Sequence, residues 1–162
     1  MSETIQCFRR IDHIAIAVRD LEDAIQFFTE VLGFRLQRRL AIRGSRTGMN
    51  SAEMEHSGIK FVLCQGTEPE SQVSKLLAHA GPGVAHIALE VDDVHDTVDE
   101  LKSRGLRFDT PVIEGPGLRQ AFSSRCANSG LSFEFIARNG EQGFVPGNVQ
   151  QLFDQLERLD TY

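Results

Sequence analysis

Two histidines and one glutamate are the residues of this 162-residue chain that could together hold a metal ion. His13 lies in a β-branched apolar run and His86 lies in a second one. Glu134 lies in a third apolar stretch, where an isolated ionised carboxylate needs a cation or a partner to offset its desolvation. Two imidazoles and one carboxylate match the facial triad of non-haem Fe(II) sites, which keep open coordination positions. The residue types therefore predict a metal site if the fold brings the three side chains together.

Each of the three residues also has a purely structural interpretation. A single histidine in a buried strand is more often a hydrogen-bonded core residue than a metal ligand. Glu134 could face solvent, because alternate residues of a strand point to opposite faces. Two histidines at equivalent positions of a repeat favour the functional interpretation, because packing alone does not require a histidine at both.

An internal repeat places the two histidines at equivalent positions. The segment 13–23, HIAIAVRDLED, aligns without a gap with the segment 86–96, HIALEVDDVHD, and six of these positions are identical. In each copy an apolar strand-like run, 11–18 or 84–91, precedes apolar residues at helical spacing. Asp20 and Asp93 stand where the N-cap of each helix is expected. Both copies are therefore predicted to begin with a strand and a helix.

Turn residues divide the chain after each helix into three more strand-like stretches. The expected strands are 34–42, 47–55 and 59–65 in the first half, and 108–113, 118–125 and 131–138 in the second. Each half is thus βαβββ, with module 1 at about 10–66 and module 2 at about 83–138, in a single α+β domain over 1–162. A short helix at 71–78 is expected between the modules, and an amphipathic helix at about 148–160 is expected to end the chain.

Composition and charge exclude several classes of partner. Hydrophobic residues make up 41% of the chain and the formal net charge is −6. An acidic protein lacks the basic face that nucleic-acid binding needs. No apolar run approaches the ~18 residues of a membrane span, and the N-terminus lacks a signal-peptide pattern. We therefore expect a cytoplasmic globular protein with no nucleic-acid or membrane partner.

The repeat and its histidines resemble the vicinal oxygen chelate superfamily of glyoxalases, bleomycin resistance proteins and dioxygenases. The resemblance covers roughly residues 10–138 and implies paired βαβββ modules that form a cupped mixed sheet around a metal. Many glyoxalase-type isomerases, epimerases and lyases of this superfamily use four protein ligands. The strand that would supply the fourth ligand here reads Lys60-Phe-Val-Leu-Cys64, and its three central residues cannot bind a metal. This absence favours a three-ligand iron site.

A closer resemblance, spread over residues 11–159, is to the iron-binding C-terminal half of 4-hydroxyphenylpyruvate dioxygenases and hydroxymandelate synthases. In that family the last metal-binding glutamate is followed by an arginine, a Gly-Phe-x-x-Gly-Asn turn and a lid helix, and residues 133–148 read FEFIARNGEQGFVPGN. Gln120-Ala-Phe-Ser123 resembles the family's Gln-Ile-Phe-Thr strand. Gly48-Met-Asn-Ser51 resembles its Gly-Leu-Asn-Ser strand, and Ser71-Gln72-Val73 resembles its Ser-Gln-Ile helix start.

This resemblance implies an Fe(II)-dependent dioxygenase that couples oxidative decarboxylation of a 4-hydroxyphenylpyruvate-like α-keto acid to hydroxylation, with O2 as the second substrate. Co, Mn, Zn or Ni are the alternative metals. The iron ligands would be His13, His86 and Glu134, with no catalytic residue beyond them. The resemblance also implies a set of substrate-binding residues: Ser51, Gln72 and Gln120 on the polar side of the pocket, Phe122 stacking on the substrate, and Phe144 and Asn148 positioning the lid helix.

Departures from the family pattern leave other functions open. Cys64, Ala85, Ser132 and Val149 replace residues that are Asn, Gln, Phe and an aromatic in the family, so the iron chemistry transfers better than the aromatic substrate does. One alternative is a metal-dependent epimerase, isomerase or lyase of the glyoxalase type. A second is a non-catalytic small-molecule binding or resistance protein, although such proteins usually lack the triad.

The epimerase alternative needs a fourth ligand and a catalytic carboxylate, for which Glu53 and Glu90 are the nearby candidates. The oligomeric state is also open. Family members commonly form dimers, and a homodimer is therefore one expectation for this chain.

Overall fold

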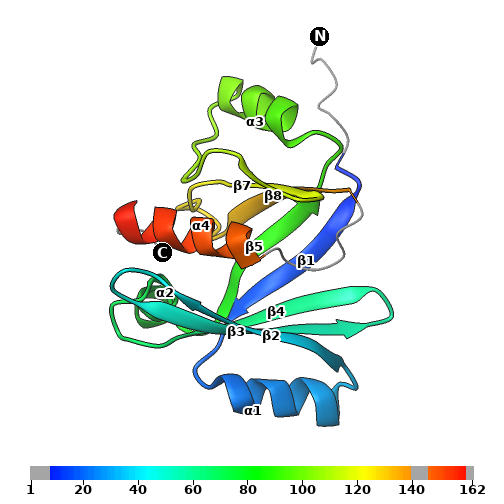
Figure 1. Cartoon of the computed structure of the whole chain (residues 1–162), viewed down its shortest axis with the longest axis vertical. Coiled ribbons are helices and arrows are strands. Elements are labelled where there is room, and N and C mark those ends of the chain that lie inside the picture. The colour runs from blue at the N-terminus through cyan, green and yellow to red at the C-terminus, as the bar shows by residue number, and fades with distance from the viewer. Residues whose placement is uncertain (1–7, 140–145, 160–162) are drawn as a thin grey trace.

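The computed structural model describes residues 8–139 and 146–159 (Figure 1). Its fold is α+β, with a single strongly curled mixed sheet in the order β2-β3-β4-β1-β5-β8-β7-β6. The strands are β1 (Arg10–Ala17), β2 (Arg35–Arg43), β3 (Gly48–His56), β4 (Ile59–Gly66), β5 (Gly83–Glu90), β6 (Ile113–Gly115), β7 (Leu118–Phe122) and β8 (Ser132–Arg138). The helices are α1 (Leu21–Gln26), continued by a π-helical turn η1 (Phe27–Val31), and α2 (Gln72–Ala80), α3 (Val94–Ser103) and α4 (Pro146–Leu159).

The two copies of the repeat meet at the centre of the sheet. β1 and β5, which begin the copies, pair antiparallel with each other. Each also pairs parallel with the last strand of its own module, β1 with β4 and β5 with β8. The sheet is therefore pseudo-symmetric about the β1–β5 seam, and the predicted paired βαβββ modules are confirmed.

The helices of the repeat pack on the outer side of the sheet. The predicted caps are confirmed, because the Asp20 carboxylate accepts a hydrogen bond from Asp23 N and that of Asp93 accepts one from Asp96 N, both at 2.9 Å. In α1, the buried side chain of Ile25 packs with Met54 and Leu63, and α3 contributes to the second core around Phe135. Figure 1 shows α1 and α3 at opposite ends of the molecule, which leaves the inner face of the sheet for the site.

The prediction of a strand at 108–113 is wrong. Only an isolated bridge joins Phe108 to Ser123, and β6 begins where the expected strand should end. Pro111 lies in this segment and has no N–H to donate to a ladder. The Thr110 hydroxyl oxygen instead accepts a hydrogen bond from Phe122 N at 3.2 Å. The expected strand at 118–125 likewise ends early, at Phe122.

The two remaining helices lie close to their predicted positions. The connecting helix is α2, capped by Ser71, whose hydroxyl accepts a hydrogen bond from Ser74 N. The C-terminal helix α4 packs against β2 in the first module and β6 in the second. Among the described residues, no helix is long and apolar enough to cross a membrane.

Candidate metal centre

His13, His86 and Glu134 meet on the inner face of the sheet. The sheet register explains this convergence, because His13 on β1 pairs with Ala88 on β5, and Ala88 pairs with Glu134 on β8. His86 precedes Ala88 by two residues, so its side chain points to the same face. Ala88 has no side chain beyond Cβ and leaves the space between the outer two residues open. Three neighbouring strands therefore direct the three side chains to one point.

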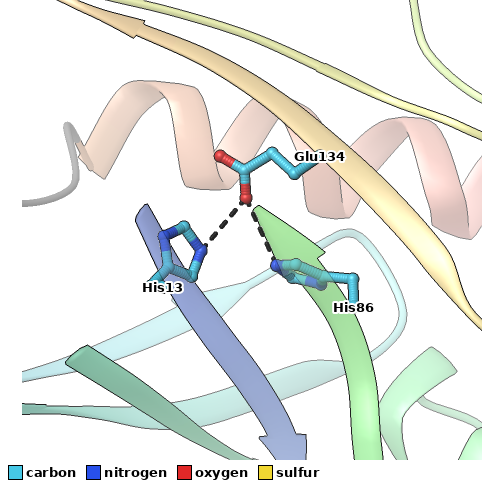
Figure 2. Close-up of side chains that lie close together, drawn as sticks. All are labelled: His13, His86 and Glu134. Carbon is cyan, nitrogen blue, oxygen red and sulfur yellow. Dashed lines mark ion pairs between the residues drawn. The ribbon is translucent and has the colours of Figure 1, made fainter. Parts of the chain in front are cut away.

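The three side chains of this triad lie close enough together to hold a metal ion. One potential ligand atom from each residue lies within 4.8 Å of the others, and no further His, Cys, Asp or Glu of the described chain joins the group. Glu134 Oε1 lies 3.2 Å from Nε2 of His13 and 3.2 Å from Nε2 of His86 (Figure 2). Two nitrogens and one oxygen thus face a common position.

Burial makes a bound cation a good fit. Glu134 is completely buried. Its Oε2 atom accepts a hydrogen bond from Gln120 Nε2 at 2.9 Å, whereas Oε1 has no hydrogen-bond donor among the described residues. An ionised oxygen in such a position is costly unless a positive charge compensates it. A divalent cation between Oε1 and the two imidazoles would supply that charge, so the donor set fits a metal.

The three groups of the triad have different protonation preferences. Burial opposes ionisation of Glu134, but the charge of His13 and the close approach of both imidazoles to the carboxylate hold the pKa of Glu134 well below its usual range. Burial also opposes charge on His13, yet Glu134 and Asp12 raise the pKa of His13 to about 9. Burial lowers the pKa of His86, which favours its neutral form. A metal would therefore replace a proton held between His13 and Glu134.

A cavity of about 50 Å³ adjoins Glu134 and His86. Four of the six residues predicted to bind substrate line it: Ser51, Gln120, Phe122 and Asn148. Gln72 lines a neighbouring cavity of about 110 Å³, which shares His86 and Phe122 with the first. Phe144 lies outside the described residues. Contact of any of these residues with a substrate stays a prediction.

Gln120 and Asn148 form a hydrogen-bonded chain behind Glu134. Asn148 Nδ2 donates to Gln120 Oε1 at 2.9 Å, and Gln120 Nε2 donates to Glu134. This chain links α4 to the triad and orients the carboxylate of Glu134. The side-chain amides of Gln120 and Asn148 therefore form hydrogen bonds within the protein, and both residues also line the cavity.

Helix α4 closes one side of the cavity with Val149 and Leu152. The other end of α4 contacts the loop between β2 and β3. Glu157 of α4 accepts hydrogen bonds from the loop hydroxyls of Ser45, at 2.6 Å, and Thr47, at 2.8 Å. These contacts hold α4 across both modules, in the place predicted for a lid helix.

The two carboxylates considered as further catalytic groups have partners outside the triad. Glu53 lines the cavity and pairs with Arg38 at 2.9 Å. Glu90 pairs with Arg10 at 2.5 Å.

Asp12 was not predicted as a site residue, but its carboxylate lies 2.7 Å from Nδ1 of His13. Its place directly before His13 was the available signal.

Most of this chain is similar in sequence to known proteins. Residues 10–127 match a family model described as the Glyoxalase/Bleomycin resistance protein/Dioxygenase superfamily. A 4-hydroxyphenylpyruvate dioxygenase of Legionella pneumophila (strain Corby) is 28% identical over 186 residues, which cover 91% of this chain and 53% of that protein. The chain thus spans about half the length of the curated relatives it matches.

Solved structures show the same relationships. A mutant of 4-hydroxymandelate synthase from Streptomyces coelicolor aligns with a TM-score of 0.82 at 25% identity, over 92% of this chain and 53% of that one. A methylmalonyl-CoA epimerase from the same organism aligns with a TM-score of 0.68 at 26% identity, over 82% of this chain and 99% of that one. With these paired modules and a family model that spans most of its length, the chain belongs to the Glyoxalase/Bleomycin resistance protein/Dioxygenase superfamily.

Proposed function

We propose that this protein is a non-haem Fe(II)-dependent dioxygenase that acts on an α-keto acid. The observation that carries the proposal is the buried triad of His13, His86 and Glu134 beside a largely apolar cavity. Similarity to a 4-hydroxyphenylpyruvate dioxygenase and to a 4-hydroxymandelate synthase supports the reaction class. A triad without a fourth ligand leaves coordination positions for a substrate and for O2.

Bound Fe(II) would supply the reaction with O2, in which oxidative decarboxylation of the keto acid is coupled to hydroxylation. The chain's contribution begins with charge. Two neutral imidazoles and one carboxylate leave a divalent site with a net charge of +1, which attracts the carboxylate of a keto acid. Gln120 keeps Glu134 oriented through a neutral amide, so it adds no charge to the site.

The walls of the cavity would receive the side chain of the keto acid and exclude water. They are formed mainly by apolar side chains: Leu40, Met49, Val62, Phe122, Val149 and Leu152. Most of these are aliphatic. A buried apolar wall keeps a reactive oxidant away from solvent and toward the substrate. The pocket therefore suits a keto acid with an apolar side chain.

Oxygen consumption by the Fe(II)-loaded full chain tests the proposal. The keto acids would include 4-hydroxyphenylpyruvate, phenylpyruvate and an aliphatic keto acid. We expect uptake that depends on one of these substrates and is lost in Glu134→Ala, because that variant removes a ligand. Glu114→Ala, which changes an exposed carboxylate that does not line the cavity, is the matched control. Full activity in Glu134→Ala would contradict the proposal.

A metal-dependent epimerase is the second candidate. Glu53 favours it, because this carboxylate lines the same cavity as His86 and Glu134 and could accept a proton from a substrate. The methylmalonyl-CoA epimerase that aligns with this chain is also covered almost completely. Such an enzyme would exchange a substrate proton with solvent in the absence of O2. Anaerobic deuterium exchange into methylmalonyl-CoA, lost in Glu53→Gln, would support this alternative and count against the dioxygenase.

A further inference from the structure

A β-bulge precedes each of the two histidines. The pairing of β1 with β5 is irregular between Ile11 and His13, so Asp12 has no partner in the ladder. The second irregularity skips Ala85, the residue before His86. A bulge re-aims the side chain of its extra residue. The repeat therefore places Asp12 and Ala85 at equivalent positions, each directly before one of the two histidines.

The first bulge puts a carboxylate behind His13. Asp12 Oδ2 lies 2.7 Å from His13 Nδ1. An ionised carboxylate can only accept hydrogen bonds, so Nδ1 must be the donor. When His13 is neutral, Nε2 then presents its lone pair toward Glu134 and the position proposed for the metal. Asp12 thus selects both the tautomer and the ring orientation that a metal ligand needs.

Arg138 holds Asp12 in place. Its guanidinium donates to both carboxylate oxygens of Asp12, from Nε at 2.8 Å and from Nη2 at 2.9 Å. The two side chains are 7% and 0% exposed. Bidentate pairs of this kind fix geometry more strongly than single contacts do. The charge of Arg138 also balances that of Asp12, so the buried carboxylate behind His13 adds no net charge to the site.

The second bulge lacks such support. Ala85 has no polar side chain to place behind His86, and its backbone oxygen accepts a hydrogen bond from Arg125 Nη1 at 2.9 Å. The side chain of His86 is 21% exposed, whereas that of His13 is 2% exposed. His86 also lines both cavities beside the triad. The two repeat-equivalent histidines thus have different surroundings.

We infer that Asp12, clamped by Arg138, is a positioning residue that fixes His13 as the preformed ligand of the metal, whereas His86 is the ligand on the substrate side. The inference rests on the metal site of the proposed function. The ion pair between Asp12 and Arg138 also spans β5, because it joins β1, which carries His13, to β8, which carries Glu134. One ion pair therefore holds two of the three ligand strands in register.

Co(II) binding to the purified full chain tests the inference. Asp12→Asn keeps the shape of the side chain but removes its negative charge and its bidentate ion pair with Arg138. Removing an outer partner of a metal-bound histidine weakens metal binding by about 10–100-fold, and we expect a loss in that range. Asp92→Asn is the matched control, because Asp92 forms a bidentate pair with Arg9 on the surface, at 2.8 and 2.9 Å. That variant should bind Co(II) like the unchanged protein.

Two further readouts separate positioning from a purely structural role. A change in the visible absorption of bound Co(II) in Asp12→Asn reports altered ligand geometry. Arg138→Lys keeps the charge but makes only a point contact, so it should bind Co(II) more tightly than Arg138→Gln does. If Asp12→Asn does not fold, this comparison of two Arg138 variants carries the test.

The outcomes are distinguishable. Asp12→Asn with a lowered melting temperature but unchanged Co(II) affinity and absorption would overturn the positioning role and leave the metal site standing. Equal Co(II) affinity in Arg138→Lys and Arg138→Gln would overturn the clamp in the same way. If the unchanged protein binds neither Co(II) nor Fe(II), the proposed function fails, and the inference fails with it.

Discussion

At the scale of single residues, the site depends on how buried charges compensate one another. Glu134 stays ionised without a hydrogen-bond donor on Oε1 because two imidazoles face that atom. His13 is placed between the carboxylates of Glu134 and Asp12, which raise its pKa to about 9 against the effect of burial. In the metal-free protein this site binds a proton where the proposed function requires a cation. Metal and proton therefore compete for His13.

We predict that Co(II) affinity increases with pH. Below the pKa of about 9, His13 must lose a proton before it can bind a metal, so affinity should fall by roughly tenfold for each pH unit as pH decreases. Calorimetric titration at pH 6.5, 7.5 and 8.5 in buffers of different ionisation enthalpy would measure the affinity and the protons released. An affinity that does not change over this range would contradict the competition.

At the scale of elements, α4 decides whether the cavity is closed. The helix joins the site through Asn148 and the β2–β3 loop through Glu157. The contact with the loop is close, because a Cβ added to Gly44 would lie 2.6 Å from Glu157 Oε2. The hydrogen bond from the hydroxyl of Ser45 does most to lower the pKa of Glu157, which is about 2. This carboxylate therefore stabilises the docked helix when it is ionised.

We predict that Glu157→Gln destabilises the protein at neutral pH by about 1–3 kcal/mol, because an amide cannot replace a carboxylate that accepts several hydrogen bonds. The folded-state pKa is lower than the ordinary value of 4.5. The stabilisation is therefore present above about 4.5 and is lost as pH falls toward 2. Urea unfolding at pH 7 and pH 3 should show a difference between variant and unchanged protein that narrows at the lower pH.

Asp154→Asn is the control for this measurement. Asp154 lies on the same helix and accepts a hydrogen bond from Gln150 at 3.1 Å. It makes a local contact within α4, so its substitution should change stability little. A difference between Glu157→Gln and the unchanged protein that widens at pH 3 would refute the assignment of the stabilisation to the ionised carboxylate.

At the scale of the whole molecule, the triad lies on the seam between the two modules. His13 belongs to the first module, and His86 and Glu134 belong to the second. Each module packs its own helix on its own core. A cation bound to all three residues would therefore join the two halves, in addition to the hydrogen bonds between β1 and β5. Metal binding should accordingly stabilise the whole sheet.

We predict that a metal present at 100 times its Kd stabilises the fold by about 2.7 kcal/mol. For a chain of this length, that corresponds to a rise in melting temperature of about 5–10 °C. Calorimetric scans with and without Co(II) would measure the shift, and a chelator should reverse it. Glu134→Ala should show no such shift. A similar rise in that variant would mean that the metal binds elsewhere.

The sequence by itself determined the repeat, the helix caps and the candidate ligands. These signals are local: Asp20 and Asp93 cap the helices that directly follow them, and apolar periodicity depends only on near neighbours. The equivalence of His13 and His86 followed from the repeat, and a carboxylate in an apolar strand drew attention to Glu134. Local propensity was not sufficient at 108–113, where Pro111 interrupts a stretch that looks like a strand.

Only the tertiary structure decided which residues surround the triad. Asp12 and Arg138 are separated by 126 positions in the chain, and Ser45 and Glu157 by 112. Neither pair has a local sequence pattern, because strand order, register and bulges bring the partners together. The sheet register places Ala88 between His13 and Glu134, and the Asp12 carboxylate meets both His13 Nδ1 and Arg138. This arrangement arises from the packing of the two modules, which no single segment encodes.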